Sequence, residues 1–455
     1  MEDMIQTDTK KLFLGLDIGT GKVAAVIADS AGFVLSAISL PHQAAVPQIA
    51  GRAEQDPEKI WAVMKNAILR LPHELRRNVV SVGVTGQMHG ILFLDTKGSP
   101  ASNLITWQDG RCLEEPEFLP TLNSKIKHGL RSGFGCATLA WMARHHQIPV
   151  NAVSSGTIHD WAVARLCGQA RPVTDPTDGA SWGCFDLSKS NWDRVALDAA
   201  EIPHGLMPEV CPCGSLGGNL SAESARQLEL PYDIPVAVAI GDNQASLLAT
   251  LRDPEHELAL TLGTGGQVSA VLPQGALPPA NSAKFEFRPY PGGRLAVVAA
   301  VLSGGSAWEW LADTAEAWLR DLGAPPCPKD DIYRRLNELG LSSETEFDVS
   351  PLFSGERFDP GLRGKISGLS SAGLKLGPLS RGLARGIFTN MRDMIPADVL
   401  AGRTRIVGSG NALRRNELLR AMVQEVFGMP ICMPDSQEEA AVGAAILGSW
   451  LMKKS

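Results

Sequence analysis

The stretch LFLGLDIGTGKVAAVI, residues 12–27, decides the fold, because it reads as two apolar β-strands joined by a tight Gly-Thr-Gly turn. Asp17 interrupts the first strand pattern just before that turn. A carboxylate buried without a partner is unfavourable, so a chain that keeps one there usually supplies a cation or a hydrogen-bond donor. The sequence therefore first raises the question of what Asp17 meets.

A second copy of the pattern, ELALTLGTGGQVSAVL, occupies residues 257–272. Its Gly-Thr-Gly turn at 263–265 lies 244 residues after the first turn at 19–21 (263 minus 19), about half of the 455-residue chain. A repeat at this distance predicts two related domains, each beginning with a glycine-turned hairpin. We place their boundary near the segment TLRDPEHE, so that the domains span 1–248 and 249–455.

The segments around the hairpins alternate strand and helix patterns, which predicts an α/β protein. A helix is expected over 57–71, with Asp56 as its N-cap and Pro57 in its first turn. A second helix is expected between Asn416, which can cap it, and Gly428, which can end it. Short strands are expected at 79–84, 91–95, 235–240 and 405–410, and a loop with a hairpin at 273–293.

Composition excludes several classes of function. Lys+Arg 42 against Asp+Glu 49 gives a net charge of -7, which offers no broad basic surface to nucleic acid. The amino end lacks the apolar core of a signal peptide and no run of 18 apolar residues occurs, so we expect a cytoplasmic protein without a membrane partner. The eight cysteines, of which only Cys211 and Cys213 are close neighbours, read as thiols in a reducing compartment.

The two glycine turns are suited to a polyphosphate. Each presents backbone N–H groups and a threonine hydroxyl to an anion, and a Mg²⁺ that accompanies the polyphosphate would give Asp17 its partner. Plain hairpin turns are the alternative, and the pairing of two turns with Asp17 disfavours it. The nucleotide motifs GxxxxGK[ST] and GxGxxG do not occur where they would be expected, so a nucleotide would bind in a different fold.

Asp242 is the candidate for acid–base chemistry. The sequence GDN at 241–243 follows the apolar strand 235–240, and ligands of α/β sheets gather at the carboxyl ends of strands. A carboxylate there can accept a proton from an alcohol whose oxygen attacks phosphorus. From sequence alone, Asp242 can equally cap the helix QASLLATL that follows it.

Two further stretches, TGQMHG at 85–90 and TWQDGR at 106–111, combine glycine turns with polar and aromatic side chains. Trp107 offers an apolar face to C–H bonds, and Gln87, His89 and Asp109 offer donors and acceptors to hydroxyl groups, a pattern typical of polyol binding. GSGN at 408–411 can receive an adenine or ribose, or can be a simple turn into a helix.

Taken together, these stretches resemble the FGGY carbohydrate kinases, a family with the fold of actin, hexokinase and Hsp70. The resemblance covers nearly the whole chain: DIGTG, AEQDP, GQMHG, TWQDGR, IGDN, LGTGG, GSGNALRRNELLRAM and EEAAVGAA follow one another in order. It implies a two-domain, ribonuclease H-like α/β fold with a ligand cleft between a sugar-binding, catalytic domain (1–248) and a nucleotide-binding domain (249–455).

The resemblance also implies roles for single residues. ATP and Mg²⁺ are the expected cofactors, with Asp242 as the general base that deprotonates the sugar and Asp17 at the metal. The sugar is expected at Gln87, Met88, His89, Trp107, Asp109, Asp242 and Asn243. ATP is expected at Thr20, Gly21, Lys22, Gly263, Thr264, Gly265, Gly408, Gly410 and Asn411.

Local strings such as GFGCAT (133–138), GTIHDW (156–161) and ASWG (180–183) most resemble sedoheptulokinases. The expected reaction is therefore transfer of the γ-phosphate of ATP to the terminal hydroxyl of sedoheptulose, giving the 7-phosphate. A xylulokinase or another ketose or polyol kinase is the alternative within the family, and a non-catalytic sugar or nucleotide sensor is the alternative from another class. Monomer and homodimer both stay open.

One position departs from the family pattern. The first hairpin of the family commonly carries a basic residue seven positions after the aspartate, where this chain has Ala24. Lys22 is the candidate substitute, because strand alternation places residues 22 and 24 on the same face.

Overall fold

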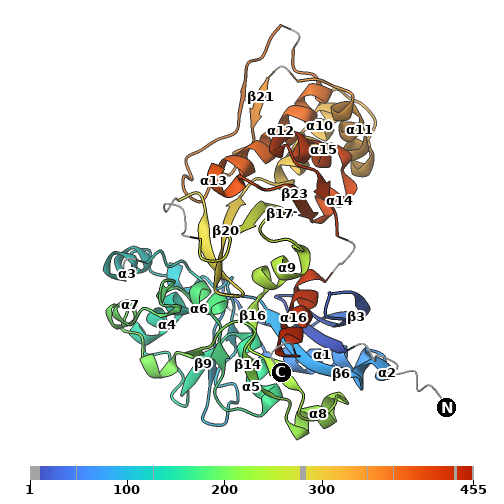
Figure 1. Cartoon of the computed structure of the whole chain (residues 1–455). Helices are drawn as coiled ribbons and strands as arrows, with labels where there is room; N and C mark the ends of the chain where they lie inside the picture. The colour runs from blue at the N-terminus through green and yellow to red at the C-terminus, as the bar shows by residue number, and fades with distance from the viewer. Residues whose placement is uncertain are drawn as a thin grey trace, which may run out of the picture. The chain divides into compact units, whose positions relative to one another are not determined.

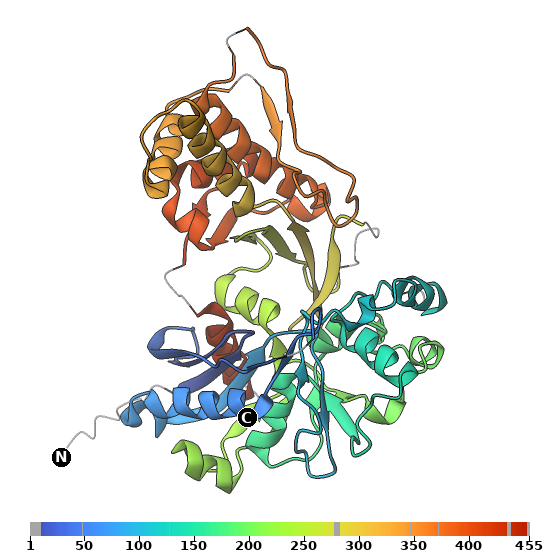
Figure 2. The same cartoon turned by 180° about the vertical axis from the view of Figure 1, so that it is seen from behind.

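The computed structural model describes residues 11–47, 49–126, 128–276, 283–345, 347–371, 373–434 and 438–452. Over these residues the chain forms two compact units (Figures 1 and 2). The first comprises residues 11–249, Pro289–Gly293 and 438–452, and the second comprises the described residues of 250–288 and 294–434. The division differs from the expected one at two places, since 289–293 and the end of the chain return to the first unit.

The first unit is built on a mixed seven-stranded sheet. Its strands are, in sheet order, β14 (Leu216–Asn219), β15 (Pro235–Ala237), β6 (Val79–Gly86), β1 (Leu12–Ile18), β2 (Lys22–Ala28) and β3 (Val34–Pro41), with β16 (Ile240–Gly241) also paired to β6. β1 and β2 form the expected antiparallel hairpin, and β1 runs parallel to β6. The strand expected at 235–240 is divided into β15 and β16, and both pair with β6.

One core lies between this sheet and helix α1 (Pro57–Arg70). The side chain of Asp56 accepts the N–H groups of Glu58 and Lys59, and Pro57 occupies the first turn, which confirms the expected helix start. Helices α2 (His73–Arg76), α5 (Ile158–Cys167) and α8 (Ala222–Leu228) also bury apolar residues in or against this core.

The C-terminal helix α16 (Glu439–Ser449) packs on the face of the seven-stranded sheet opposite α1, and is drawn in red among the elements of the first unit (Figure 1). A Cβ atom on Gly15 of β1 would overlap with the carbonyl oxygen of Ala441, and one on Gly83 of β6 with that of Ala444. Helix and sheet backbones are thus in direct contact, which only glycine permits at these two positions. This packing explains why the end of the chain belongs to the first unit.

The rest of the first unit surrounds a second, smaller core. The helices here are α3 (Phe118–Ile126), α4 (Gly135–Arg144), α6 (Pro176–Trp182) and α7 (Arg194–Ala199), with α9 (Asp242–Thr250) following β16. Small sheets pair β4 (Ala45–Val46) with β5 (Glu54–Gln55) and β8 (Leu104–Ile105), β7 (Leu92–Leu94) with β9 (Ser154–Gly156), β10 (Val173–Thr174) with β13 (Glu209–Val210), and β11 (Phe185–Asp186) with β12 (Asn191–Trp192). Short 3₁₀ turns are η1 (Arg111–Leu113), η2 (His204–Leu206) and η3 (Trp450–Met452).

The second unit has a six-stranded sheet around its own core. In sheet order the strands are β19 (Glu286–Tyr290), β20 (Arg294–Val301), β18 (Gly266–Val271), β17 (Glu257–Leu262), β23 (Arg405–Ser409) and β24 (Ile431–Cys432), and β21 (Asp348–Ser350) pairs separately with β22 (Lys365–Ser367). The helices are α10 (Gly305–Asp321), α11 (Lys329–Leu341), α12 (Leu376–Asp393), α13 (Ala397–Leu400), α14 (Asn411–Arg415) and α15 (Glu417–Phe427). Asn416 caps α15 and Gly428 ends it at a positive φ of 66°, as expected. Of the hairpin expected within 273–293, only β19 lies in that range, because its partner β20 begins at Arg294. Residues 277–282 lie outside the described chain.

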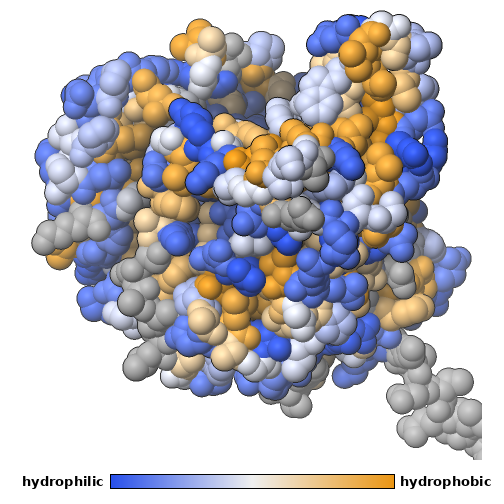
Figure 3. Space-filling view, turned by 90° about the horizontal axis from the view of Figure 1, so that it is seen from above, coloured by the Kyte–Doolittle hydropathy of each residue, from blue (hydrophilic) through white to orange (hydrophobic). Residues whose placement is uncertain are grey.

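The predicted repeat is confirmed in backbone register. In the first unit Asp17 of β1 pairs with Thr85 of the parallel strand β6, and in the second unit Thr261 of β17 pairs with Ser409 of the parallel strand β23. Among the described helices, none is long and apolar enough to cross a membrane. On the face shown in Figure 3, apolar and hydrophilic residues are interspersed.

Candidate active site

The first glycine turn, residues 19–21, is held from outside by His42. The N–H of Ala44 donates to Nδ1 of His42 over 3.1 Å, so Nε2 carries the ring hydrogen and donates to the carbonyl oxygen of Gly19 over 3.2 Å. Burial lowers the pKa of His42 below its usual value, which keeps this neutral tautomer in place. The turn therefore has a fixed backbone shape.

Asp17 lies two residues before that turn and is partly buried. Its Oδ1 atom is shielded from solvent and has no hydrogen-bond partner among the described residues. Burial raises the pKa of Asp17 to about 7, and the charges of Asp242 and Glu438 act in the same direction while Lys22 opposes them. A hard divalent cation would favour the ionised carboxylate, so this orphaned oxygen fits a Mg²⁺ ligand.

Asp242 begins α9 directly after β16. β16 and β1 flank β6, because both Ile240 and Asp17 pair with Thr85, so the two aspartates lie at the same end of one sheet. The hydroxyl of Thr85 donates to the carbonyl oxygen of Ile240 over 2.6 Å, and the N–H of Gly241 donates to the hydroxyl of Thr177 over 2.9 Å. The backbone that carries Asp242 is thus held from two sides.

Asn243 follows Asp242 in the first turn of α9. Its Oδ1 atom is buried and has no hydrogen-bond partner in the part of the chain that the structure describes. An unused amide oxygen next to Asp242 is available to a sugar hydroxyl. The structure therefore leaves the expected role of Asn243 intact.

Gln87 and Met88, both expected to contact the sugar, are buried. Gln87 is only 2% exposed, and its Nε2 donates to Oε1 of Gln55 over 2.9 Å. The side chain of Met88 packs so closely against Gly241 that a Cβ atom there would overlap with it. Both residues therefore support the backbone around the turn and around Asp242.

His89 adopts a positive φ of 72° at the end of the GQMHG stretch. Its ring stacks on Phe134 with centroids 4.7 Å apart, and Nδ1 donates to the carbonyl oxygen of Ser181 over 2.6 Å. Since Nδ1 holds the hydrogen, Nε2 is the acceptor of this ring. The geometry thus gives His89 a defined tautomer for recognising a hydroxyl donor.

Trp107 is the most exposed of the expected sugar-binding residues, at 46%. Its Nε1–H donates to the hydroxyl of Thr20, in the phosphate turn, over 2.9 Å. The indole therefore connects the stretch assigned to the sugar with the turn assigned to phosphate.

The expectation that Asp109 contacts the sugar is not supported. Both carboxylate oxygens are occupied: Oδ1 accepts the N–H and Nε–H groups of Arg111, and Oδ2 accepts the N–H of Ala53 and Nη2 of Arg111, at 2.7–3.1 Å. Arg111 also pairs with Glu54 over 2.8 Å. With 1% exposure, Asp109 instead stabilises the loop that carries Trp107.

The departure at Ala24 has a structural reason. Ala24 is fully buried in a cluster with Ala441, Val442 and Ala445 of α16, where a basic side chain has no room. Lys22 is exposed, and its Nζ lies 2.8 Å from both carboxylate oxygens of Glu438. The expected phosphate contact of Lys22 therefore competes with an existing ion pair.

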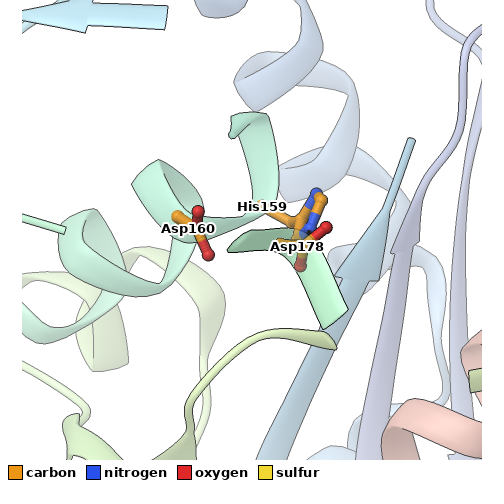
Figure 4. Close-up of side chains that lie close together, drawn as sticks. All are labelled: His159, Asp160 and Asp178. Carbon is orange, nitrogen blue, oxygen red and sulfur yellow. Dashed lines mark hydrogen bonds and ion pairs between the residues drawn. The ribbon is translucent and has the colours of Figure 1, made fainter. Parts of the chain in front are cut away.

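A second group of buried ionisable residues, His159, Asp160 and Asp178, lies close enough to Asp242 to interact with its charge. Figure 4 shows the imidazole of His159 beside the carboxylate of Asp178, 2.7 Å apart, with Asp160 on the same helix as His159. One ligand atom from each lies within 4.8 Å of the others. Burial raises the pKa of Asp160 and of nearby Asp175 to about 7, raises that of Asp178 well above its usual value and lowers that of His159. Burial thus favours the protonated form of these carboxyl groups.

In the second unit, the turn 263–265 docks on the start of α10. The N–H groups of Gly305 and Ser306 donate to the carbonyl oxygens of Gly263 and Thr264 over 2.8 and 2.9 Å. The amino end of this 17-residue helix favours negative charge nearby. This contact was not predicted from the sequence, although LSGGS at 302–306, directly after a strand, indicates a helix start there.

Two of the glycines assigned to ATP have packing roles. A Cβ atom on Gly408, inside β23, would press against Ile431 and Met433. Gly410 has a positive φ of 99°, and a Cβ atom there would overlap with the backbone of Leu262. Asn411 is exposed at the start of α14. Of these three, Asn411 is the residue whose side chain can reach a ligand.

Comparison with known proteins settles the family. Family models match both parts of the chain: the N-terminal domain of the FGGY family of carbohydrate kinases over residues 12–249, and its C-terminal domain over residues 258–452. The chain belongs to the FGGY carbohydrate kinases. This FGGY kinase is 33% identical to a sedoheptulokinase of Mus musculus and 32% identical to one of Homo sapiens, over 96% of this chain and 97% of each relative. It is 26% identical to a xylulose kinase of Escherichia coli, over 96% of this chain and 88% of the relative.

Solved structures confirm the predicted fold class. A "xyloylose kinase" of Brucella ovis superposes with a TM-score of 0.81 at 25% identity, over 98% of this chain and 91% of that chain. A ligand-bound xylulose kinase of Lactobacillus acidophilus superposes with a TM-score of 0.79 at 20% identity, over 98% and 90% of the two chains. The fold thus agrees with the family models, which make the chain a carbohydrate kinase of a family that uses ATP as phosphate donor.

Gln55 and His42 are the site residues that sequence reasoning missed in the first unit. Gln55 stands in the AEQDP stretch, which carried the resemblance but received no role. Its Nε2 donates to the carbonyl oxygen of Thr20 over 2.7 Å. His42 lies in no motif, and only the fold reveals its contact with Gly19.

Proposed function

We propose that this FGGY kinase transfers the γ-phosphate of ATP to the terminal hydroxyl of sedoheptulose, giving sedoheptulose 7-phosphate. The observation that carries the choice of sugar is the similarity to sedoheptulokinases, 33% and 32% identity along almost the whole length of both chains. The GFGCAT, GTIHDW and ASWG strings support the same choice.

Asp242 is the proposed general base. Its place at the carboxyl end of β16, close enough to Asp17 for the two charges to interact, supports this role. Asp242 accepts the proton of the terminal sugar hydroxyl while that oxygen attacks the γ-phosphorus in line with the departing ADP. The backbone hydrogen bonds around Ile240 and Gly241 keep the carboxylate where the hydroxyl arrives.

Few side-chain groups are proposed to hold the sugar. We assign the C–H face of the ketose to the indole of Trp107, and its hydroxyls to Nε2 of His89, Oδ1 of Asn243 and Asp242. The exposure of Trp107 and the unused buried acceptor of Asn243 support this assignment. Gln87 and Met88 act behind these contacts, because both side chains are buried.

The nucleotide is assigned to glycine turns and to one metal ligand. Thr20 and Gly21 of the first unit and Gly263, Thr264, Gly265 and Asn411 of the second unit are the proposed ATP contacts. Mg²⁺, when bound, neutralises phosphate charge, and the orphaned Oδ1 of Asp17 is the group that would hold it. All eight cysteines are free thiols, which supports the proposed cytoplasmic location.

A substrate panel tests this proposal. ADP formation from MgATP is measured with sedoheptulose, xylulose, ribulose, fructose and glycerol, and kcat/KM is compared among them. We expect the highest kcat/KM with sedoheptulose. A higher value with another sugar would replace the substrate and keep the kinase. Sugar binding without ADP formation from any member of the panel would favour the sensor instead.

A further inference from the structure

Four side chains link the exposed indole of Trp107 to the phosphate turn. Trp107 can only donate, so the hydroxyl of Thr20 accepts its Nε1–H over 2.9 Å and turns its own hydrogen toward Oε1 of Gln87, 3.4 Å away. Gln87 then uses Nε2 to donate to Oε1 of Gln55, over 2.9 Å. Gln55 uses Nε2 to donate to the carbonyl oxygen of Thr20, over 2.7 Å. The hydrogen bonds thus form a closed loop that begins and ends at Thr20. Because Trp107 can only donate, it fixes which atom of each pair is the donor.

Gln55 holds this loop to the rigid part of the first unit. It is 6% exposed and lies in β5, whose strand partners are in β4 and β8. The next residue, Asp56, caps α1. A carboxamide in this position can hold Thr20 and Gln87 at once without moving.

The loop that carries Trp107 is equally well anchored. The N–H and hydroxyl of Thr106 both donate to the carbonyl oxygen of Ala53, over 3.0 and 3.1 Å. The buried pair of Asp109 and Arg111 ties the far end of the loop to Glu54. Since the backbone on both sides is held, the indole of Trp107 is the part of the loop that a sugar can move.

The longest link of this hydrogen-bonded loop is the one from Thr20 to Gln87. The contact of 3.4 Å between Thr20 and Gln87 exceeds the usual length of an O–H···O hydrogen bond, about 2.8 Å, whereas the other three links are of normal length. A sugar that settles on Trp107 changes the position of its Nε1–H, and the hydroxyl of Thr20 is the next atom to respond.

We propose that Gln55 is a positioning residue for phosphoryl transfer, because it makes the geometry of Thr20 in the phosphate turn depend on a sugar bound at Trp107. The proposal rests on the proposed function. The hydroxyl of Thr20 is oriented for transfer only when the indole is covered, so the phosphoryl group passes to the sugar in preference to water. Loss of this hydrogen-bonded loop uncouples ATP cleavage from sugar phosphorylation, so that ADP forms without an equal amount of sugar phosphate.

The experiment counts ADP and sugar phosphate separately, with MgATP and sedoheptulose, for the full chain and four variants. Gln55→Met keeps the length of the side chain but removes its amide, and Thr20→Val removes the hydroxyl from a partly exposed turn. Thr20→Ser keeps the hydroxyl. Gln227→Met, on the exposed face of α8, is the matched control for Gln55.

Gln55→Met and Thr20→Val are each expected to lower the kcat of sugar phosphorylation about tenfold, the loss that one hydrogen bond accounts for, and to raise the ADP formed per sugar phosphate above one. The KM for the sugar is expected to stay within about threefold, because Trp107 is retained. Gln227→Met is expected to match the wild type in both ratio and rate. Thr20→Ser, which keeps the hydroxyl, is expected to keep a ratio of one and to lose less rate than Thr20→Val.

Two results would overturn the proposal. One is an ADP to sugar phosphate ratio of one in both Gln55→Met and Thr20→Val, which would give these residues a purely structural role. The other is an equal defect in Thr20→Ser and Thr20→Val. If Gln55→Met fails to fold, the pair of Thr20 variants decides the matter alone. A wild type that phosphorylates no member of the sugar panel would refute the proposed function, and the coupling with it, before any variant is measured.

Discussion

The two Gly-Thr-Gly hairpins have the same backbone arrangement but differ in the side chains around the turn. Two residues before the turn, the first hairpin carries Asp17, with a buried oxygen that lacks a partner among the described residues. The second carries Thr261, whose hydroxyl lies 2.8 Å from that of Ser409. The polar group of the second copy thus has a side-chain partner at the surface, whereas the buried oxygen of the first has none among the described residues and fits a ligand.

The surroundings of the two hairpins differ as well. Gly15 and Gly83 admit the backbone of α16 against the first sheet, but their counterparts in register, Ala259 and Val407, carry side chains. The duplicated fold supplies the glycine turn twice, and single residues then set the two copies apart. In the proposed function the first copy serves the metal and the sugar, so that function depends on where the copies differ.

Among the changes that compare the two hairpins, the largest effect is expected from removing the charge of Asp17. Asp17→Asn is expected to lower kcat by about two to three orders of magnitude, the usual range for loss of one group that stabilises transition-state charge. The matched change in the second copy, Thr261→Val, is expected to lower kcat less than about tenfold, because only one neutral hydrogen bond is lost. Steady-state ADP release at saturating MgATP and sugar measures both. Equal losses in the two variants would remove the functional difference between the copies.

The next effect concerns stability. Gly15→Ala places a methyl group against the carbonyl oxygen of Ala441 and is expected to destabilise the protein by about 3 kcal/mol. Gly21→Ala, in the turn of the same hairpin, meets no atom within 4 Å and is expected to change stability by less than about 0.5 kcal/mol. Urea unfolding followed by circular dichroism compares them. A stable Gly15→Ala variant would contradict direct backbone contact between α16 and β1.

A smaller effect is expected from pH on the stability of the protein in the absence of nucleotide and metal. Asp17 has a raised pKa, from 3.8 to about 7, so the folded protein binds more protons than the unfolded chain between these values. Stability from this group is therefore lost as pH rises through that window and stays low above pH 7. Asp160 and Asp175, with pKa values also raised to about 7, act in the same direction.

Thermal unfolding at pH 5 and pH 8 measures this dependence. The Tm of the wild type is expected to be lower at pH 8 than at pH 5. Asp17→Asn is expected to reduce this difference by at least about 2 °C. The variant Thr261→Val serves as control, since it removes no ionisable group. An Asp17→Asn variant with the same fall as the wild type would show that Asp17 keeps an ordinary pKa.

The smallest effect is expected at Lys22. Its exposed ion pair with Glu438 contributes less than about 1 kcal/mol, so Lys22→Met is expected to leave stability almost unchanged. Because Glu438 already engages the ammonium group, the KM for ATP is expected to change less than about threefold. A rise in that KM of tenfold or more would restore Lys22 as the substitute for the basic residue of the family.

Local patterns were sufficient to predict the parts of the site that depend on neighbours in sequence. The hairpin turns, the capping of α1 by Asp56, the end of α15 at Gly428 and the place of Asp242 after a strand all follow from short-range rules. The same is true of the repeat, because its two copies preserve their glycine turns.

The rest could not be predicted, because it depends on contacts between distant residues. Asp109 reads as a sugar ligand until the fold brings Ala53 and Arg111 to its oxygens. Ala24 reads as a lost basic residue until α16 is seen to cover it. Gln55 lies 35 residues after Thr20, and no local pattern pairs an amide in a short strand with a glycine turn.

The most direct test of the central claim is a single-turnover measurement of sedoheptulose 7-phosphate with Asp242→Asn and the wild type, beside ATP affinity from isothermal titration calorimetry. If Asp242 is the base of a sugar kinase, the variant binds ATP within about threefold of the wild type but forms sugar phosphate at least about a thousandfold more slowly, the scale of general base catalysis. Transfer by Asp242→Asn at the wild-type rate would contradict the account.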